Sequence, residues 1–281
     1  MALAENRIIT SAMTNSLSIA VAGAAGRMGR QLIAASLAAK HTITGGTETA
    51  DSLFLSEDLG VLADKKPIGL KPVTDVVSAA ANASIWIDFT VPAATLAALE
   101  SLRHTGVQAV IIGTTGFSDE EEQAIARAAE HFAIVKAGNF SLGVNLMTAL
   151  TKIAAERLGP DWDIEISETH HRRKVDAPSG TALMIGEAAA EGRGKPLSDL
   201  RDAPYDGPSA KRVSGKIGFA VRRMGGVIGE HEATFGSEKE LLTIGHVALE
   251  RSVFAEGALE AARWATSAEP GLYNMDDVLD L

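Results

Sequence analysis

The segment from Glu168 to Thr181 holds the residues of this chain best suited to acid–base chemistry on a small anion. It reads ETHHRRKVDAPSGT, and five basic side chains, His170 to Lys174, precede a turn and a helix start. Histidine exchanges protons near neutral pH, and a helix N-terminus offers free N–H groups to a carboxylate. The chain as a whole has a net charge of -10. This local positive charge therefore predicts a site for a small dicarboxylate.

The helix start is what favours a binding site here. A run of charges is often only a solvated surface loop, and that alternative stays open for the HHRRK residues. Ser179 is the expected N-cap, which leaves the amides of Gly180 and Thr181 without partners inside the helix. His170 and His171 are neighbours on an expected strand, so their side chains point to opposite faces unless the strand ends there.

A glycine pattern near the start of the chain predicts a dinucleotide site. Gly23, Gly26 and Gly29 form G-x-x-G-x-x-G, with Ala25 where the usual pattern has its second glycine. Small residues let the backbone approach a pyrophosphate at the N-terminus of the following helix. Glu48 ends the next strand, where a carboxylate accepts hydrogen bonds from the adenosine ribose. The plainer alternatives are close strand–helix packing for the glycines and an ordinary exposed strand end for Glu48.

Two further turns follow later strands. Gly113-Thr114-Thr115-Gly116 follows QAVII, and Ala137-Gly138-Asn139-Phe140 follows AIV. Ligands of doubly wound sheets bind at the carboxyl ends of the strands, so the backbone of both turns is expected near a nicotinamide. Both could also be no more than tight strand–helix turns.

The elements that must position these residues alternate in the first half of the chain. Short apolar runs predict strands, and periodic segments between them predict helices, one of them with a Ser118–Glu121 capping box. The expected strands are 17–22, 42–47, 84–89, 108–112 and 132–135, and the expected helices are 30–39, 92–104 and 118–131. This alternation predicts an α/β fold, an N-terminal Rossmann-type doubly wound parallel sheet.

The pattern changes after about residue 140. A helix is expected over 146–158, a strand over 161–171 and a mobile loop over 192–212, while glycine-punctuated strands over 216–249 have the pattern of a β-meander. A final helix over 252–266 can return to the first sheet. The second unit is thus expected to be a C-terminal α+β domain with a mixed or antiparallel open sheet.

Composition excludes several classes of function. The chain has no cysteine, which removes disulfides, thiolate nucleophiles and cysteine zinc sites, and no histidine spacing predicts a metal. No apolar run is long enough for a membrane span, and the acidic balance disfavours nucleic acid. We therefore expect a cytoplasmic enzyme. Residues 1–16 are expected to be a flexible leader, and Met13 is an alternative natural start.

The motifs together resemble a known family. GAAGRMGR at 23–30, GTTGF at 113–117, AGNFS at 137–141, the segment 168–181 and the ending GLYNMDDVL are similar to bacterial 4-hydroxy-tetrahydrodipicolinate (dihydrodipicolinate) reductases. The resemblance runs from about residue 17 to the C-terminus. It implies an oxidoreductase of lysine and diaminopimelate biosynthesis that uses NADH or NADPH to reduce a cyclic imine with two carboxylates, and that is usually a homotetramer.

The resemblance also implies roles for individual residues. His170 is the implied proton donor and Lys174 a second acid that supports the ring nitrogen, while His171, Gly180 and Thr181 bind a substrate carboxylate. The implied dinucleotide-binding residues are Gly23, Ala24, Ala25, Gly26, Arg27, Met28, Glu48, Gly113, Thr114, Thr115, Ala137, Gly138, Asn139 and Phe140. A dinucleotide-binding domain is expected over 17–140 and 251–281, and a substrate-binding and tetramerisation domain over 141–250.

One position departs from part of the family. Some members carry an arginine after the acidic residue that ends the second strand, and this chain has Thr49 there. Because Glu48 repels a 2′-phosphate and only Arg27 remains to bind one, we predict NADH to be at least as good as NADPH. Two rival functions remain: a dehydrogenase of another small acid such as aspartate, or a dinucleotide-sensing protein without turnover.

Overall fold

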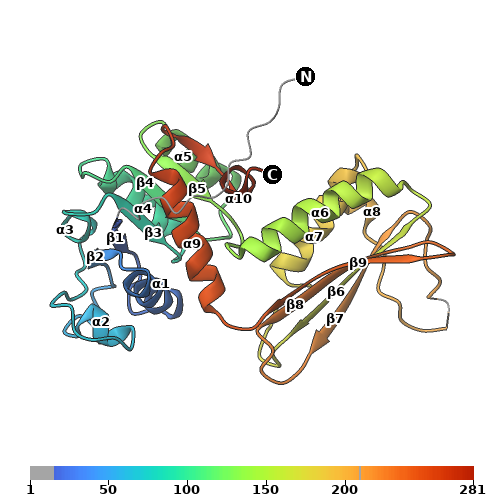
Figure 1. Ribbon diagram of the computed structural model, residues 1–281, viewed down its shortest axis with the longest axis horizontal. Coiled ribbons are helices and arrows are strands. Elements are labelled where there is room, and N and C mark those ends of the chain that lie inside the picture. The colour runs from blue at the N-terminus through green and yellow to red at the C-terminus, as the bar shows by residue number, and fades with distance from the viewer. Residues whose placement is uncertain (1–15, 209) are drawn as a thin grey trace, which may run out of the picture.

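The computed structural model of the chain describes residues 16–208 and 210–281. Its elements form two lobes that lie side by side, each built on one β-sheet (Figure 1). The predicted leader and the alternative start at Met13 fall outside the described residues, except for Ser16. The Ser16 hydroxyl donates a hydrogen bond of 3.2 Å to the Lys40 carbonyl.

The first lobe is built on a six-stranded parallel sheet with the order β10-β5-β4-β3-β1-β2. Its strands are short, and the inner strands β1, β3, β4 and β5 are almost wholly buried, as expected for a parallel sheet covered on both faces. They are β1 (Ser18–Val21), β2 (Thr42–Gly46), β3 (Ile85–Asp88), β4 (Ala109–Ile112), β5 (Ala133–Lys136) and β10 (Gly271–Tyr273). The predicted Rossmann-type sheet is confirmed.

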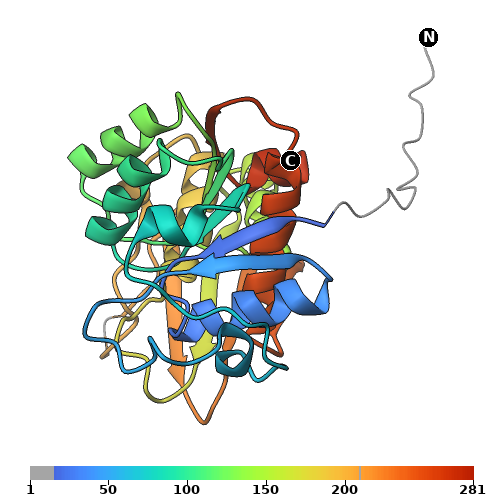
Figure 2. The same ribbon diagram turned by 90° about the vertical axis from the view of Figure 1, so that its left-hand side faces the viewer.

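Helices cover both faces of this sheet because alternate strand residues point to opposite sides. Ile19 and Ile87 pack in a core with α1 and α9, whereas Ala20 and Trp86 pack on the opposite face with α3, α4 and α5 (Figure 2). The helices of the first lobe are α1 (Arg27–Ala38), α2 (Leu59–Leu62), α3 (Val76–Ala80), α4 (Pro92–Leu102), α5 (Asp119–Ala128), α9 (Ser252–Ala265) and α10 (Met275–Leu279). The predicted capping box at the start of α5 is present.

The strand order fixes where a ligand can bind. β2 is the last strand on one side of the sheet. Just beyond β2, Thr47 forms an isolated parallel bridge with Val73, so Val73 lies on the outer side of this edge. The order reverses between β1 and β3, the point at which doubly wound sheets form a crevice at the carboxyl ends of their strands. The glycine turn after β1 lies at this crevice.

The second lobe has a four-stranded mixed sheet with the order β7-β6-β8-β9. Its strands are β6 (Asp163–His170), β7 (Ile217–Arg223), β8 (Gly229–Gly236) and β9 (Leu241–Ala248). The predicted β-meander is wrong: β6 lies between β7 and β8 and pairs in parallel with β7. A parallel pair needs a long crossover, and the connection through α7 (Gly180–Gly192) supplies it. This helix and α6 (Leu142–Leu158) lie together over the sheet in Figure 1.

The segment 192–212, predicted to be a mobile loop, is more ordered than expected. It contains the short helix α8 (Leu197–Leu200). Arg212 near its end pairs with Asp163 Oδ1 at 2.9 Å and with Glu165 Oε2 at 2.7 Å. These ion pairs attach the end of the segment to the start of β6.

Candidate active site

The turn between β1 and α1 brings backbone groups to the crevice of the first lobe. Gly23 has a φ of +59°, and the Gly26 N–H donates to its carbonyl at 2.9 Å. A Cβ on Gly29 would overlap that carbonyl oxygen, so only glycine permits α1 to start this close to β1. The N-cap of α1, Gly26, has no side-chain cap. The first N–H groups of α1 are therefore available to a phosphate.

Glu48 faces the same turn. Its Oε1 accepts a 2.7 Å hydrogen bond from the Ala25 N–H. A cavity of about 590 Å³ opens here, and its wall includes Gly23, Ala25, Gly26, Arg27, Met28, Gly29, Glu48, Thr49, Asp51 and Phe54. The predicted residue Ala24 is fully buried beneath this wall. The lining thus combines an uncapped helix start and small residues, which fit a pyrophosphate, with a carboxylate, which fits the hydroxyls of an adenosine ribose.

The turn after β4 supports the crevice wall with its side chains. Thr114 is buried, and its hydroxyl accepts from the Thr90 N–H at 2.9 Å and donates to Asp88 Oδ1 at 3.2 Å. A Cβ on Gly113 would overlap the ring of Phe89. Thr115 and Gly116 are exposed in this turn, whereas the Thr114 side chain is buried, so Gly113 and Thr114 can meet a ligand through their backbone alone.

The turn after β5 also has both buried and exposed residues. Phe140 is buried and packs against Phe89 with ring centroids 5.3 Å apart, while Gly138 is exposed. Asn139 reaches across to the second lobe, where its side-chain amide donates a 3.0 Å hydrogen bond to the Thr181 hydroxyl. This bond brings together the turn predicted to hold the dinucleotide and the helix start predicted to hold the substrate.

The second lobe places ionisable side chains on the covered face of its sheet. Alternation along β6 puts Ile164 and Ile166 on the face that packs against the helices, and Glu168 and His170 follow them on that face. Across the sheet His231 is in register with Glu168, and Arg223 with His170. The covered face thus changes from apolar to ionisable at the carboxyl ends of β6 and β7.

Glu168 is the centre of this group. Its side chain is 1% exposed, and Oε2 lies 2.6 Å from His170 Nδ1. Arg223 donates to both carboxylate oxygens, at 2.7 and 2.8 Å, and the Ser179 N–H donates to Oε1 at 3.0 Å. The Ser179 hydroxyl caps α7 by accepting from the Ala182 N–H, and it also contacts His231 Nε2 at 3.1 Å.

These contacts set the protonation states of the group. Burial by itself would raise the pKa of Glu168, but hydrogen bonds from Arg223, His170 and Ser179 outweigh it and hold the pKa below its ordinary value. Burial lowers the pKa of His170, and Glu168 opposes this shift. Burial lowers the pKa of His231 to about 4, aided by the nearby His170. Of the two rings, His170 is therefore the one whose protonation the surroundings support, because the carboxylate of Glu168 lies beside it.

The other basic residues of the predicted segment separate in the structure. Lys174 is largely covered and pairs with Asp176 Oδ2 at 2.9 Å, whereas Arg172 and Arg173 are exposed. β6 ends at His170, so His171 begins the following loop and the two histidines do not share a strand. α7 starts at Gly180 with Ser179 as its N-cap, as predicted.

Three members of the group were missed from the sequence. Glu168 was quoted within the motif without a role, although its alternation with His170 was a usable signal. Arg223 and His231 come from β7 and β8, far along the chain, and only the sheet register brings them to His170. No local pattern marks them.

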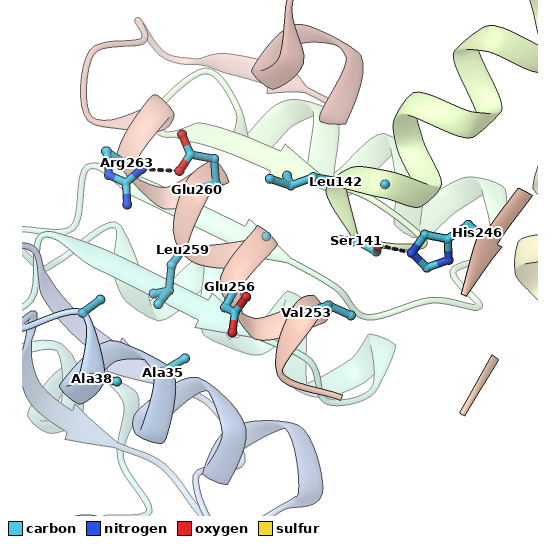
Figure 3. A pocket seen from close by; sticks show the side chains of 13 residues that line it. Ala35, Ala38, Ser141, Leu142, His246, Val253, Glu256, Leu259, Glu260 and Arg263 are labelled. Atoms are coloured by element: carbon cyan, nitrogen blue, oxygen red, sulfur yellow. Dashed lines mark hydrogen bonds and ion pairs between the residues drawn. The ribbon is translucent and has the colours of Figure 1, made fainter. Parts of the chain in front are cut away.

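A second cavity, of about 570 Å³, lies where α1, α9, β9 and the start of α6 meet. Figure 3 shows its wall of mostly apolar side chains, such as Ala35, Leu142 and Leu259, and the hydrogen bond of 3.3 Å between Ser141 Oγ and His246 Nε2. None of the predicted site residues lines it.

In the part of the chain that the structure describes, no three His, Asp or Glu side chains are grouped as a metal site would require. Within the same residues, no helix is both long enough and apolar enough to cross a membrane.

The fold and the site define a dinucleotide-dependent oxidoreductase with a Rossmann-type lobe and a second lobe that carries a buried carboxylate–histidine pair. Comparison with known families agrees. A model described as "Dihydrodipicolinate reductase, N-terminus" matches residues 17–140, and one described as "Dihydrodipicolinate reductase, C-terminus" matches residues 143–279. The chain belongs to the dihydrodipicolinate reductase family.

Relatives and a solved structure support this membership, and a more distant structure shares the fold. Proteins named 4-hydroxy-tetrahydrodipicolinate reductase from Parvibaculum lavamentivorans and Dinoroseobacter shibae are 50% and 48% identical, over 96% of this chain and 100% of theirs. A dipicolinate-bound dihydrodipicolinate reductase from Paenisporosarcina sp. TG-14 is 25% identical with a TM-score of 0.72, covering 92% of this chain and 98% of its own. An amine dehydrogenase from Mycobacterium smegmatis, at 12% identity and a TM-score of 0.63, shares the fold, with 92% and 95% covered.

The predictions of the family, of the fold class and of an oxidoreductase that uses a nicotinamide dinucleotide are confirmed. The choice between NADH and NADPH and the role of each site residue stay predictions.

Proposed function

We propose that this chain reduces 4-hydroxy-tetrahydrodipicolinate, by way of dihydrodipicolinate, to tetrahydrodipicolinate in lysine and diaminopimelate biosynthesis. The Asn139–Thr181 hydrogen bond is the observation that carries the proposal, because it joins the predicted dinucleotide and substrate sites into one. A bound, reduced nicotinamide supplies a hydride to the substrate ring. His170 supplies the proton to the neighbouring carbon through Nε2, because its Nδ1 is occupied by Glu168.

The substrate carboxylates are held by the start of α7. The amides of Gly180 and Thr181 have no partner within that helix, and Gly180 is exposed. His171 lies beside them in sequence, after the end of β6, and adds a donor for a carboxylate. Lys174, kept close to the site by Asp176, is the second acid that supports the ring nitrogen.

The dinucleotide is held by the glycine turn after β1, by Glu48 and by the backbone of the turns after β4 and β5. We propose that NADH serves at least as well as NADPH. Glu48 already accepts from the Ala25 N–H and faces the cavity together with Asp51, so two carboxylates oppose a 2′-phosphate. Thr49 adds no positive charge, and only Arg27 on this wall offers one.

The division of the chain follows the two sheets. We propose that residues 17–140 and 251–281 form the dinucleotide-binding domain and that residues 141–250 form the substrate-binding domain. We also propose a homotetramer held by the uncovered face of the second sheet, on which Leu241 and Val247 are largely exposed. A cytoplasmic location stays a prediction from the sequence.

One experiment tests the activity and the cofactor. Oxidation of NADH and of NADPH is followed by absorbance, with substrate made in situ from pyruvate and aspartate semialdehyde by a coupling synthase. We expect rapid oxidation that requires the synthase, and a KM for NADH no higher than that for NADPH. A much lower KM for NADPH would contradict the cofactor proposal. Dinucleotide binding without oxidation would instead favour another small acid as substrate or a sensing protein.

A further inference from the structure

Glu168 does more than neutralise the charge of Arg223, because it also accepts hydrogen bonds from two other groups. It accepts two bonds from that arginine, one from the Ser179 N–H and one from His170 Nδ1, the shortest of the four at 2.6 Å. A carboxylate can only accept, so Nδ1 must carry the hydrogen of the bond to His170. The neutral His170 ring is thereby restricted to one tautomer.

The remaining nitrogen of His170, Nε2, is not held by the part of the protein that the structure describes. Among the described residues Nε2 has no hydrogen-bond partner, and it is not among the fully buried unpaired atoms. A Cβ on Gly229 would lie 3.1 Å from Nε2, so the absence of a side chain there leaves room at this nitrogen. The ring therefore presents a free Nε2 on the side where Glu168 does not hold it.

Four ionisable groups face His170 from the surrounding elements. Glu168 on β6 stabilises its charged form, whereas Lys174 in the loop after β6, Arg223 on β7 and His231 on β8 are basic. His231 is edge-on to His170 with ring centroids 5.1 Å apart. Since Glu168 is the one acidic group in this set, it alone offsets burial and the basic neighbours.

We propose that Glu168, oriented by Arg223, is a positioning residue: it fixes the tautomer and ring orientation of His170 and holds the start of α7 at a constant place beside that ring. The proposal rests on the proposed role of His170 as proton donor. One carboxylate thus joins the acid to the amides of Gly180 and Thr181, through the Ser179 N–H. The proton donor His170 and the amides proposed to bind a substrate carboxylate then keep a fixed distance and orientation.

A matched variant on the same strand separates this role from a merely structural one. Glu165 also pairs with an arginine, Arg212, at 2.7 Å, but contacts no histidine. Glu168→Gln keeps the shape of the side chain and removes its charge. We expect kcat to fall about a hundredfold with KM little changed, the range of a lost general acid. The pH above which activity is lost should also move down, whereas Glu165→Gln should leave both unchanged.

A double-mutant cycle tests whether Glu168 acts through His170. We expect His170→Ala to lower kcat far more than it raises KM, and Glu168→Gln to add no further loss of kcat in the His170→Ala background. An equal further loss in that background, or a rise in KM without a change of the pH profile, would overturn the proposal. Either result would show that Glu168 only supports the fold.

Nitrogen-15 NMR of the unmodified enzyme gives a measurement that needs no folded Glu168 variant and no turnover. The His170 signals are identified by their loss in His170→Ala. We expect the neutral ring to carry hydrogen on Nδ1, with Nε2 free. Hydrogen on Nε2 of the neutral ring would refute the positioning role even if the reductase activity is confirmed. The expected tautomer without activity would instead place the failure in the proposed function.

Discussion

At the scale of single residues, the site depends on two histidines in contact that differ in their surroundings. His170 is hydrogen-bonded to a carboxylate, while the one side-chain hydrogen bond of His231 to a described residue is with the Ser179 hydroxyl. Burial without an acidic partner disfavours the imidazolium, so His231 stays neutral where His170 can be charged. The first proton therefore goes to the ring with the open Nε2.

The neutral state of His231 predicts a loss of stability in acid. Its pKa falls from 6.5 in the unfolded chain to about 4 in the fold, so between these values the unfolded chain binds the extra proton. The free energy of unfolding should therefore fall as the pH falls through this window. Between pH 7 and about pH 5, we expect the free energy of unfolding to fall by about 2 kcal/mol less in His231→Gln than in the wild type. Urea denaturation at both pH values measures this difference.

The exposed His104 provides the control for this experiment. His104→Gln should follow the wild-type pH dependence. Parallel curves for His231→Gln and the wild type would contradict the prediction. His41, His170 and His246 also have lowered pKa values through burial, so the pH dependence of the His231 variant should be reduced and not abolished.

At the scale of elements, the sequence predicted those whose signals are local. The glycine turn, the Ser118 capping box and the Ser179 N-cap were correct because each depends on a few adjacent residues. β10 was missed because a strand of three residues, Gly271 to Tyr273, is too short to show an alternation of apolar and polar residues. It forms by pairing with the free edge of β5. The meander was wrong because strand order depends on the long crossover through α7, which glycine spacing does not encode.

The contact of α9 with the turn after β5 predicts a stability defect. A Cβ on Gly257 would overlap the Phe140 carbonyl oxygen, which is buried backbone and cannot move freely. We expect Gly257→Ala to lower the free energy of unfolding by about 1–3 kcal/mol, despite the better helix propensity of alanine. Gly106→Ala, where the new methyl meets open space, is the control for thermal unfolding. Equal melting temperatures for the two variants would show that α9 shifts to make room.

At the scale of the whole molecule, the chain leaves the first lobe after Phe140, builds the second lobe and returns. α9 brings a row of buried residues to the first core: Ala255, Ala258, Leu259, Ala261, Ala262 and Ala265. β10 then covers the edge of β5. The first lobe is thus completed only by the last part of the chain, and the second lobe is a single continuous insertion.

This topology predicts how fragments behave. Residues 1–140 alone should not fold stably, because the face of the core beneath α9 and the edge of β5 would be exposed. Joining 1–140 to 251–281 through a short glycine–serine linker should restore a folded unit that binds NADH. Circular dichroism melting and NADH fluorescence measure both outcomes. Cooperative unfolding and NADH binding by residues 1–140 alone would refute the predicted dependence on α9 and β10.

The hydrogen bond from Asn139 to Thr181 has a consequence for how two ligands share one protein. We expect a ligand that orders the turn around Asn139 to order the start of α7 as well, and a ligand at α7 to order that turn. Thermodynamic linkage then requires that each ligand change the affinity of the other by the same factor. We therefore expect the dinucleotide and the substrate to raise each other's affinity, so that release of one product weakens the binding of the other.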